Sequence, residues 1–249
     1  MRSYNLSFIS DNNLFNHVKE TMEKYSFNIN LIKFNSNLID PIKLTFDKMA
    51  YNKEWKDVIE SEVYRQIDKS NTNHIGYFHQ NIFKYFNNCE VPKEGWDVIF
   101  DDVKNKKKYY VEMKNKHNTM NYSSSSKTYM NMQNHLLTSL DKDISICSLV
   151  EVIATNSQNI PWVITLNKTK MVPNERLRRI SIDKFYEIVT GEREAFKNLC
   201  AILPIVMEDV FEALPDSFIN NTVYSELILK NSDILKSIYK LAFSSYLGF

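Results

Sequence analysis

The middle of the chain alternates apolar and polar side chains with a period of two residues, and this feature constrains the fold most. A first run from Trp96 to Phe100 is followed by a polar segment and by a second run from Tyr109 to Lys114. Alternation with this period is typical of β-strands that have one buried face. The short, lysine-rich segment between the runs predicts that the two strands form a hairpin.

Helical patterns precede this hairpin. Apolar residues at helical spacing predict four helices within residues 1–90, and these begin near Asp11, Asp40, Lys53 and Ile75. Aspartate is a good N-cap residue, and a proline such as Pro41 is tolerated in the first turn of a helix. The fourth helix is expected to be separate from the third and shorter.

The chain after the hairpin predicts a helix, two strands and further helices. A run of serines precedes the helix, which passes through Leu136, and strands follow at Ser148–Ala154 and Trp162–Leu166. Beyond Ile182 the pattern is helical again, with prolines expected to interrupt it before a final helix. We therefore expect an α/β (α+β) fold, with a central mixed β-sheet of four to five strands flanked by helices. One domain is expected over residues 1–249, with helical parts at 1–90 and 171–249 and the sheet within 91–170.

Composition excludes several classes of protein. The 31 Lys and Arg residues nearly balance the 30 Asp and Glu residues, and 43% of residues are hydrophobic, as in an ordinary globular protein. The three cysteines, Cys89, Cys147 and Cys200, are too widely spaced for a disulfide framework or a zinc knuckle. Because no apolar segment resembles a secretory signal or a membrane span, we expect a cytoplasmic protein without a membrane partner.

The second strand of the hairpin carries an acid and a lysine on one face. Glu112 and Lys114 lie two residues apart, which on a strand is roughly 6–7 Å, while the apolar Val111 and Met113 point to the opposite face. If the two strands pair, Asp97 of the first strand meets Glu112. Two carboxylates and a lysine suit hydrolysis of phosphodiesters assisted by a divalent metal ion.

The acid–x–lysine triplet alone is not specific. The sequence also contains Glu54-Trp55-Lys56 and Asp102-Val103-Lys104. Only the triplet from Glu112 to Lys114 lies on a predicted strand that follows a strand-borne acid. An ordinary hairpin with a solvated, charged face remains the alternative interpretation of these residues.

The spacing of these residues is similar to a known motif. Asp97, a gap of fourteen residues and then Glu112-Met113-Lys114 resemble the PD-(D/E)xK nuclease superfamily, although Trp96 stands where that motif has proline. The segments 75–80 (IGYFHQ) and 114–121 (KNKHNTMN) resemble the type II restriction endonucleases that cut GGNCC-type palindromes. The resemblance extends from about residue 62 to the C-terminal helices.

This resemblance implies a restriction-endonuclease-like core and roles for individual residues. Asp97 and Glu112 would bind Mg²⁺, or Mn²⁺ as a substitute, together with the backbone carbonyl of Met113, and Lys114 would assist the attacking water. Many relatives place a further glutamate on a helix before the first strand. Gln80 occupies roughly that place, and Glu62 on the preceding helix is another candidate.

The resemblance also implies a function and its partners. A Mg²⁺-dependent, site-specific deoxyribonuclease of restriction type would act on double-stranded DNA, as a homodimer that matches a palindrome. A DNA methyltransferase would protect the same site in the host. A repair or junction-resolving nuclease with the same active site, and a non-catalytic DNA-binding module, remain alternatives.

Several polar residues are candidates for contacts to DNA. Asn can bind adenine, and Lys or Arg can bind guanine or phosphate. A polar loop and a solvated hairpin turn are the plainer interpretations of the same residues. Residues 103–116 hold six lysines and one acid, so local positive charge is possible despite the net charge of +1. The candidates after the second strand are Asn115, Lys116, His117, Asn118, Asn121 and Lys127, and further phosphate contacts are possible at Lys104, Lys106, Lys107, Lys108, Arg176, Arg178 and Arg179.

Overall fold

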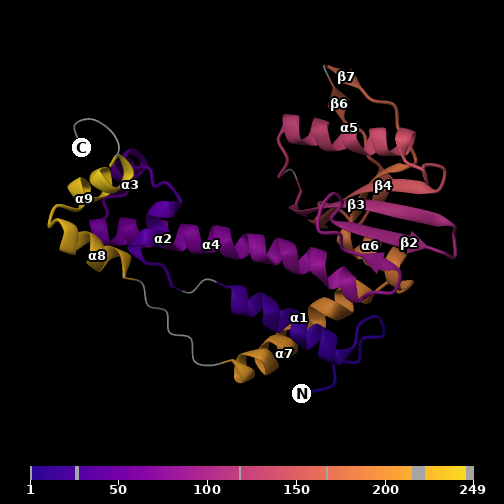
Figure 1. Ribbon diagram of the computed structural model, residues 1–249, viewed down its shortest axis with the longest axis horizontal. Helices are drawn as coiled ribbons and strands as arrows, with labels where there is room; N and C mark the ends of the chain where they lie inside the picture. Colours follow the sequence, from indigo (N-terminus) through magenta and orange to yellow (C-terminus); the bar gives the residue numbers. More distant parts are fainter. Residues whose placement is uncertain (1, 26–27, 118, 167, 215–221, 245–249) are drawn as a thin grey trace. The chain divides into compact units, whose positions relative to one another are not determined.

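The computed structural model describes residues 2–25, 28–117, 119–166, 168–214 and 222–244. The chain divides into two compact units (Figure 1). The first comprises residues 1–22 and 75–213, and the second comprises residues 23–74 and 214–249. The single domain that the sequence predicts stays a prediction, and the units are described separately below.

The second unit is helical. Caps define where its helices begin: Asp40 accepts hydrogen bonds from the backbone N–H groups of Ile42 and Lys43, and Asp233 accepts one from Lys236. The expected final helix is two helices, α8 and α9. Its elements are α2 (Leu31–Ser36), α3 (Pro41–Ala50), the first part of α4 (Trp55–Asn81), α8 (Val223–Lys230) and α9 (Ile234–Ala242), and its core contains Phe34, Leu44, Ile59, Val63, Leu227 and Ile238.

The prediction of two separate helices over residues 53–86 is wrong. Helix α4 is continuous from Trp55 to Asn81, and only the 3₁₀ turn η1 (Ile82–Tyr85) follows it. The polar stretch Ser70–His74 interrupts the apolar pattern, but it contains neither proline nor glycine to end a helix. The apolar pattern is therefore interrupted while the helix itself continues.

The first unit is built on a mixed β-sheet of six strands, where four to five were expected. The strand order is β1-β2-β3-β4-β8-β5; β3, β4 and β8 are parallel, and the other neighbouring pairs are antiparallel. The α/β fold class is thus confirmed. The strands are β1 (Cys89–Glu90), β2 (Val98–Asp102), β3 (Lys107–Lys116), β4 (Ser145–Ile153), β5 (Asn159–Pro161) and β8 (Leu177–Ser181).

The crossover from β3 to the parallel strand β4 runs through helix α5 (Tyr122–Thr138), which packs on one face of the sheet. Asn121 caps this helix by accepting a hydrogen bond from the backbone N–H of Ser124 at 2.8 Å. The serine run at 123–126 therefore lies inside the helix and not before it. Tyr129, Met132 and Leu136 of α5 form a buried core with Tyr110, Cys147, Leu149, Trp162 and Leu177.

The opposite face of the sheet is covered by helix α6 (Ile182–Thr190), which contacts β4 and β8. Gly191 ends this helix with a φ of 76°, a conformation that glycine adopts readily. Pro204 was expected to interrupt the next helix, but it lies inside α7 (Ala195–Ala213). Helix α1 (Asp11–Lys24) completes the unit, and the expected strand at 162–166 is reduced to β6 (Thr165–Leu166), which pairs with β7 (Thr169–Lys170).

The hairpin of β2 and β3 determines where the polar residues of the motif lie. Because the strands are antiparallel, the start of β2 and the end of β3 lie at the same end of the hairpin. The turn at residues 103–106 lies at the other end of the hairpin. Across the described ranges, no helix is both long enough and apolar enough to span a membrane.

Candidate active site

The two acids of the motif lie side by side where β2 begins. Val98 of β2 pairs with Val111 of β3, and one residue before Val98 the Asp97 N–H donates to the carbonyl of Val111 at 2.9 Å. Asp97 and Glu112 each adjoin this pair along their strands, and the charge of Asp97 acts on the Glu112 carboxyl, so the hairpin brings the two carboxylates close together. The hairpin predicted from the alternating pattern is thus confirmed.

A backbone N–H and the side chain of Gln80 hold Asp97 in place. Its Oδ2 accepts a hydrogen bond from the N–H of Met113 at 2.6 Å. This carboxylate oxygen thus replaces a backbone carbonyl as the acceptor where the pairing of the two strands ends. The carbonyl of Asp97 accepts a hydrogen bond from Nε2 of Gln80 at 3.2 Å. Within the described ranges, no hydrogen-bond donor contacts the other carboxylate oxygen, Oδ1. The side chain is fixed but has one oxygen available.

Glu112 is partly buried beside this like charge. Burial and the charge of Asp97 raise the pKa of Glu112, and Lys114 opposes this shift. The Lys114 Nζ lies 3.5 Å from Glu112 Oε2, and these two side chains are 34% and 27% exposed. One lysine therefore compensates the pair of carboxylates incompletely.

This arrangement suits a hard divalent cation. Carboxylate oxygens are the ligands that Mg²⁺ prefers, and it usually keeps several waters when one or two carboxylates bind it. Among the described residues, no group of three or more His, Cys, Asp or Glu side chains is arranged to hold a metal ion. The donors on hand are Asp97 Oδ1 and the Glu112 carboxylate, and the repulsion between these acids is what a cation would relieve. The Met113 carbonyl stays a predicted ligand.

The two accessory candidates differ in their surroundings. Gln80 lies at the end of α4 in the first unit and contacts the backbone of Asp97. Glu62 belongs to the second unit, where its buried carboxylate accepts hydrogen bonds from Arg65 at 2.5 and 2.6 Å and from Gln66 at 3.1 Å. Glu62 thus already has a full set of partners in its own unit, whereas Gln80 supports the site backbone.

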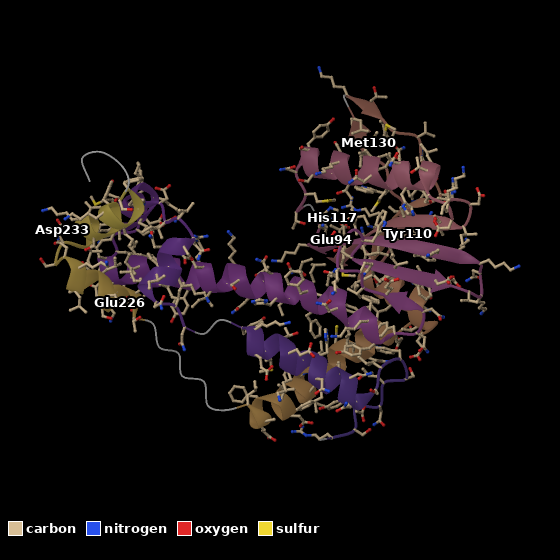
Figure 2. The ribbon with its side chains drawn as sticks, in the orientation of Figure 1. Glu94, Tyr110, His117, Met130, Glu226 and Asp233 are labelled. Carbon is tan, nitrogen blue, oxygen red and sulfur yellow. The ribbon has the colours of Figure 1, made fainter. Side chains whose placement is uncertain are left out.

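The candidate DNA-binding residues follow the site along the chain. Asn115 and Lys116 end β3, and His117 comes directly after it (Figure 2). Asn121 uses its side chain as the N-cap of α5, which gives this residue a structural role. Asn118 lies outside the described residues, and Lys127 is exposed on α5.

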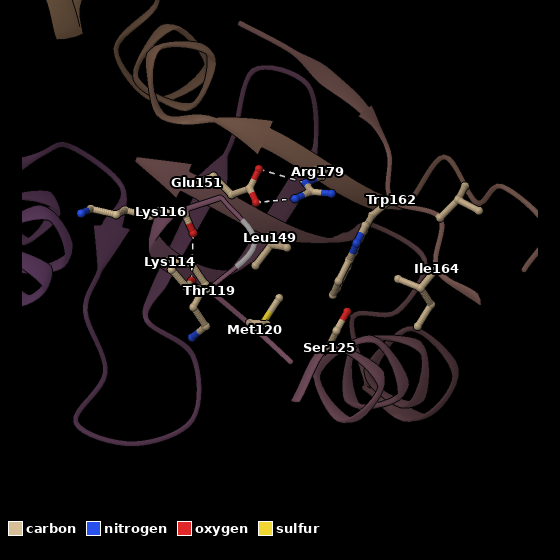
Figure 3. Close-up of a pocket in the computed structure, with 11 residues that line it drawn as sticks. Lys114, Lys116, Thr119, Met120, Ser125, Leu149, Glu151, Trp162, Ile164 and Arg179 are labelled. Carbon is tan, nitrogen blue, oxygen red and sulfur yellow. Dashed lines mark hydrogen bonds and ion pairs between the residues drawn. The ribbon is translucent and has the colours of Figure 1, made fainter. Parts of the chain in front are cut away.

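Glu151 and Arg179 are polar neighbours of the site that the sequence motif does not include. Glu151 lies opposite Lys114 in the register of β3 and β4, and Arg179 of β8 donates two hydrogen bonds to it, at 2.5 and 2.9 Å (Figure 3). Its position within the otherwise uncharged run of β4 was the available signal, because a buried charge requires a partner. The identity of that partner required the register of β8.

The lysines of residues 103–116 do not form one patch. Lys104 and Lys106 lie in the turn, at the edge of the sheet opposite Asp97, whereas Lys114 and Lys116 lie at the site. The six lysines counted together along the sequence are therefore divided between the two ends of the hairpin. Only the second group lies near the acids.

The arginines before α6 have partners in the protein. Arg176 donates to the carbonyl of Lys142 at 2.6 Å, and Arg178 donates to the side chain of Asn159 at 2.8 Å and pairs with Glu175. These contacts give the arginines structural roles, which the sequence left open.

Comparison with known proteins identifies the family. Residues 6–212 match the family described as Eco47II restriction endonuclease. The type II restriction enzyme Sau96I of Staphylococcus aureus is 33% identical over 217 residues, which cover 83% of this chain and 81% of that protein. The type II restriction enzyme Eco47II of Escherichia coli is 29% identical over 218 residues, or 82% of this chain and 87% of that protein. The chain therefore belongs to the Eco47II restriction endonuclease family of type II restriction enzymes.

Proposed function

We propose that this restriction enzyme hydrolyses phosphodiester bonds of double-stranded DNA in a Mg²⁺-dependent reaction at a short palindromic site, of the GGNCC type. The observation that carries the proposal is the pair of carboxylates of Asp97 and Glu112. Lys114 lies beside this pair and compensates its negative charge only in part. Membership of the restriction endonuclease family supports the choice of DNA over other phosphodiesters.

Asp97 and Glu112 would hold the metal ion, with the Met113 carbonyl as a further ligand. When bound, Mg²⁺ polarises the phosphate and lowers the pKa of a coordinated water. The Met113 N–H keeps Asp97 Oδ2 in place, so that Oδ1 faces no competing donor among the described residues. Mn²⁺ would substitute because it takes the same oxygen ligands.

Lys114 would act on the reacting groups directly. Its Nζ is close enough to Glu112 to be oriented by it, and a third of the side chain is exposed, so that it can reach a water or a phosphate oxygen. There it orients the attacking water or stabilises the negative charge that develops on the phosphate. Hydrolysis transfers a proton from the water to the leaving oxygen as the P–O bond breaks. Gln80 supports the position of Asp97 and contacts no reacting atom in this account.

The proposed partners follow from a palindromic target. Two copies related by a two-fold axis would present one active site to each strand, so we expect a homodimer. A DNA methyltransferase of the same specificity would protect the host DNA, and the enzyme would act in the cytoplasm. Asn115, Lys116, His117 and Lys127 are the proposed contacts to DNA near the site.

Cleavage of plasmid DNA tests the proposal. Purified protein is incubated with plasmid and Mg²⁺, with parallel reactions in EDTA and in Mn²⁺, and the ends of the products are sequenced. We expect discrete fragments with Mg²⁺ or Mn²⁺, none with EDTA, and ends that map to one short palindrome. A smear, or cleavage only at branched or damaged DNA, would instead favour a repair nuclease. Binding without cleavage in every metal would favour a non-catalytic module.

A further inference from the structure

Glu151, Arg179 and His117 form a cluster of three side chains around the buried Glu151 carboxylate, beside the active site. Glu151 lies on β4, Arg179 on β8 and His117 directly after β3, so the cluster ties three neighbouring strands together. Only 3% of the Glu151 side chain is exposed. Burial alone would raise the pKa of this carboxyl, but the hydrogen bonds from Arg179 outweigh burial and lower it.

The cluster adjoins the catalytic lysine. Lys114, Glu151 and Arg179 line one cavity of about 120 Å³, together with apolar side chains that include Trp162 (Figure 3). In addition, the N–H of His117 donates to the carbonyl of Ile153 at 2.9 Å, which anchors the backbone three residues after Lys114. The cluster is thus placed to orient the side chain of His117, the residue that directly follows β3.

Arg179 restricts the hydrogen-bonding state of His117. One of its nitrogens, Nη2, lies 2.5 Å from Glu151 Oε1 and 2.7 Å from His117 Nδ1. A guanidinium nitrogen only donates, so a proton on Nδ1 would put two donors 2.7 Å apart. The Glu151 oxygens, which could accept such a proton, lie further from Nδ1, at 3.1 and 3.2 Å, so the shorter contact with Arg179 favours an unprotonated Nδ1. The Nη2 group has two hydrogens, and it can donate one to the carboxylate and one to an unprotonated Nδ1.

The consequence concerns the other ring nitrogen. If Nδ1 accepts, neutral His117 carries its proton on Nε2 and becomes a hydrogen-bond donor there. No acceptor contacts Nε2 in the described part of the chain, and 24% of the side chain is exposed. This places an oriented donor directly after the active-site strand.

We propose that Arg179, held by Glu151, is a positioning residue that keeps the His117 proton on Nε2, from which His117 donates a hydrogen bond to an acceptor on bound DNA. The DNA part of this proposal rests on the proposed function. The tautomer part does not, because it concerns the free protein. The acceptor is a phosphate oxygen or an acceptor atom at a base edge, and the second experiment distinguishes them.

The first experiment determines the tautomer by NMR of ¹⁵N-histidine-labelled protein, in which the two ring nitrogens are assigned through their couplings to the ring protons. We expect the Nε2–H tautomer at His117 in the wild type and a loss of this preference in Arg179→Lys. This variant keeps the positive charge beside Glu151 but lacks the planar guanidinium that donates to Glu151 and His117 together. Arg178→Lys on the same strand is the control and should leave the His117 spectrum unchanged. An Nδ1–H tautomer in the wild type, or a spectrum that Arg179→Lys does not alter, would overturn the proposal.

The second experiment measures DNA binding with Mg²⁺ in a Lys114→Ala background, so that the duplex is not cut. The probes are a duplex with the mapped cleavage site and the same duplex with one base pair changed. His117→Gln keeps an amide near the Nε2 position, and His117→Asn keeps one only near Nδ1. We expect His117→Asn to bind the mapped site about tenfold more weakly, and His117→Gln to lose much less.

The pattern of loss identifies the acceptor. Loss on the mapped site alone indicates a base, whereas equal loss on both duplexes, with an unchanged salt dependence because the donor is neutral, indicates a phosphate. Equal binding by the parent and both His117 variants would overturn the DNA part of the proposal. If the wild type cuts no DNA, the proposed function fails, whereas the NMR result still decides the role of Arg179.

Discussion

Strand β3 carries a lysine near each of its two ends, on the same face, and each lysine lies beside an acid, Asp141 of the turn before β4 or Glu112 of β3 itself. The two ends differ in how the charge of the acid is compensated. At the turn end, Lys108 Nζ lies 3.3 Å from Asp141, which also accepts hydrogen bonds from the hydroxyls of Tyr110 and Ser145. At the site end, Lys114 Nζ lies 3.5 Å from Glu112, on which the like charge of Asp97 also acts.

The electrostatic outcomes are opposite. Burial disfavours the charge of Asp141, but hydrogen bonds from Tyr110, Lys108 and Ser145 outweigh it and lower the pKa to about 2. Burial also disfavours the charge of Glu112, and there the charge of Asp97 adds to the effect and raises the pKa. A lysine is present in both cases, so the other neighbours decide the sign.

The difference separates a structural acid from a functional one. Asp141 has donors around it and stabilises the turn between α5 and β4 without any further ligand. The negative charge of Glu112 is compensated only in part, so a bound cation would stabilise it. Such incompletely compensated acids are concentrated at functional sites. An acid–lysine pair in the sequence does not reveal which kind it is.

Removal of the site lysine should have the largest effect. We expect Lys114→Ala to lower the cleavage rate by about 10³-fold or more, because it removes a cation aimed at developing charge, while DNA binding changes only a few-fold. Lys56→Ala, in an exposed acid–x–lysine triplet of α4, is the matched control and should cleave normally. Cleavage of undiminished rate by Lys114→Ala would show that the site has been assigned wrongly.

Removal of the second carboxylate should weaken metal binding. We expect Asp97→Ala to bind Mg²⁺ at least about tenfold more weakly in calorimetric titrations, since one of two charged ligands is lost. Asp101→Ala, an exposed acid of the same strand β2, is the control and should bind Mg²⁺ as the wild type does. Equal affinities for all three proteins would exclude Asp97 as a ligand.

Protons should compete with Mg²⁺ at Glu112. Because its pKa is raised, cleavage should decline with falling pH already above the ordinary range of a glutamate. A tenfold increase in Mg²⁺ should then move this decline to lower pH, by up to about one unit. Single-turnover rates across pH at two Mg²⁺ concentrations measure the shift. A decline at the same pH in both series would argue against metal binding by this group.

Asp141 should contribute to stability except in acid. Its pKa is lowered in the folded state, so its contribution is present above the unfolded value near 4 and is lost as the pH falls towards about 2. We expect Asp141→Asn to reduce the free energy of unfolding by about 1–2 kcal/mol at pH 7, allowing for partial exposure. Urea unfolding at pH 7 and below pH 3 measures this, and a loss of equal size at both pH values would contradict the linkage.

The proximity of Asp97 and Glu112 could be predicted from the sequence, whereas the contacts around them could not. Period-two alternation and a short turn are local signals, and they were enough to place Asp97 beside Glu112. The pairing of Glu151 with Arg179 depends on β8, a strand of five residues with two arginines, and its place beside β4 is set by tertiary packing. The continuity of α4 was not predicted because a local signal was misleading. Its polar stretch interrupts the apolar pattern but does not end the helix.

One paired measurement tests the contrast between the two ends of β3 most directly. Glu112→Gln and Asp141→Asn each replace a carboxylate by an amide of the same size, and the free energy of unfolding of both is measured against the wild type at pH 7 without divalent metal. Our account predicts opposite signs: Glu112→Gln stabilises the protein because it removes an incompletely compensated charge, and Asp141→Asn destabilises it. Destabilisation by both variants would contradict it, because Glu112 would then be an ordinary structural acid.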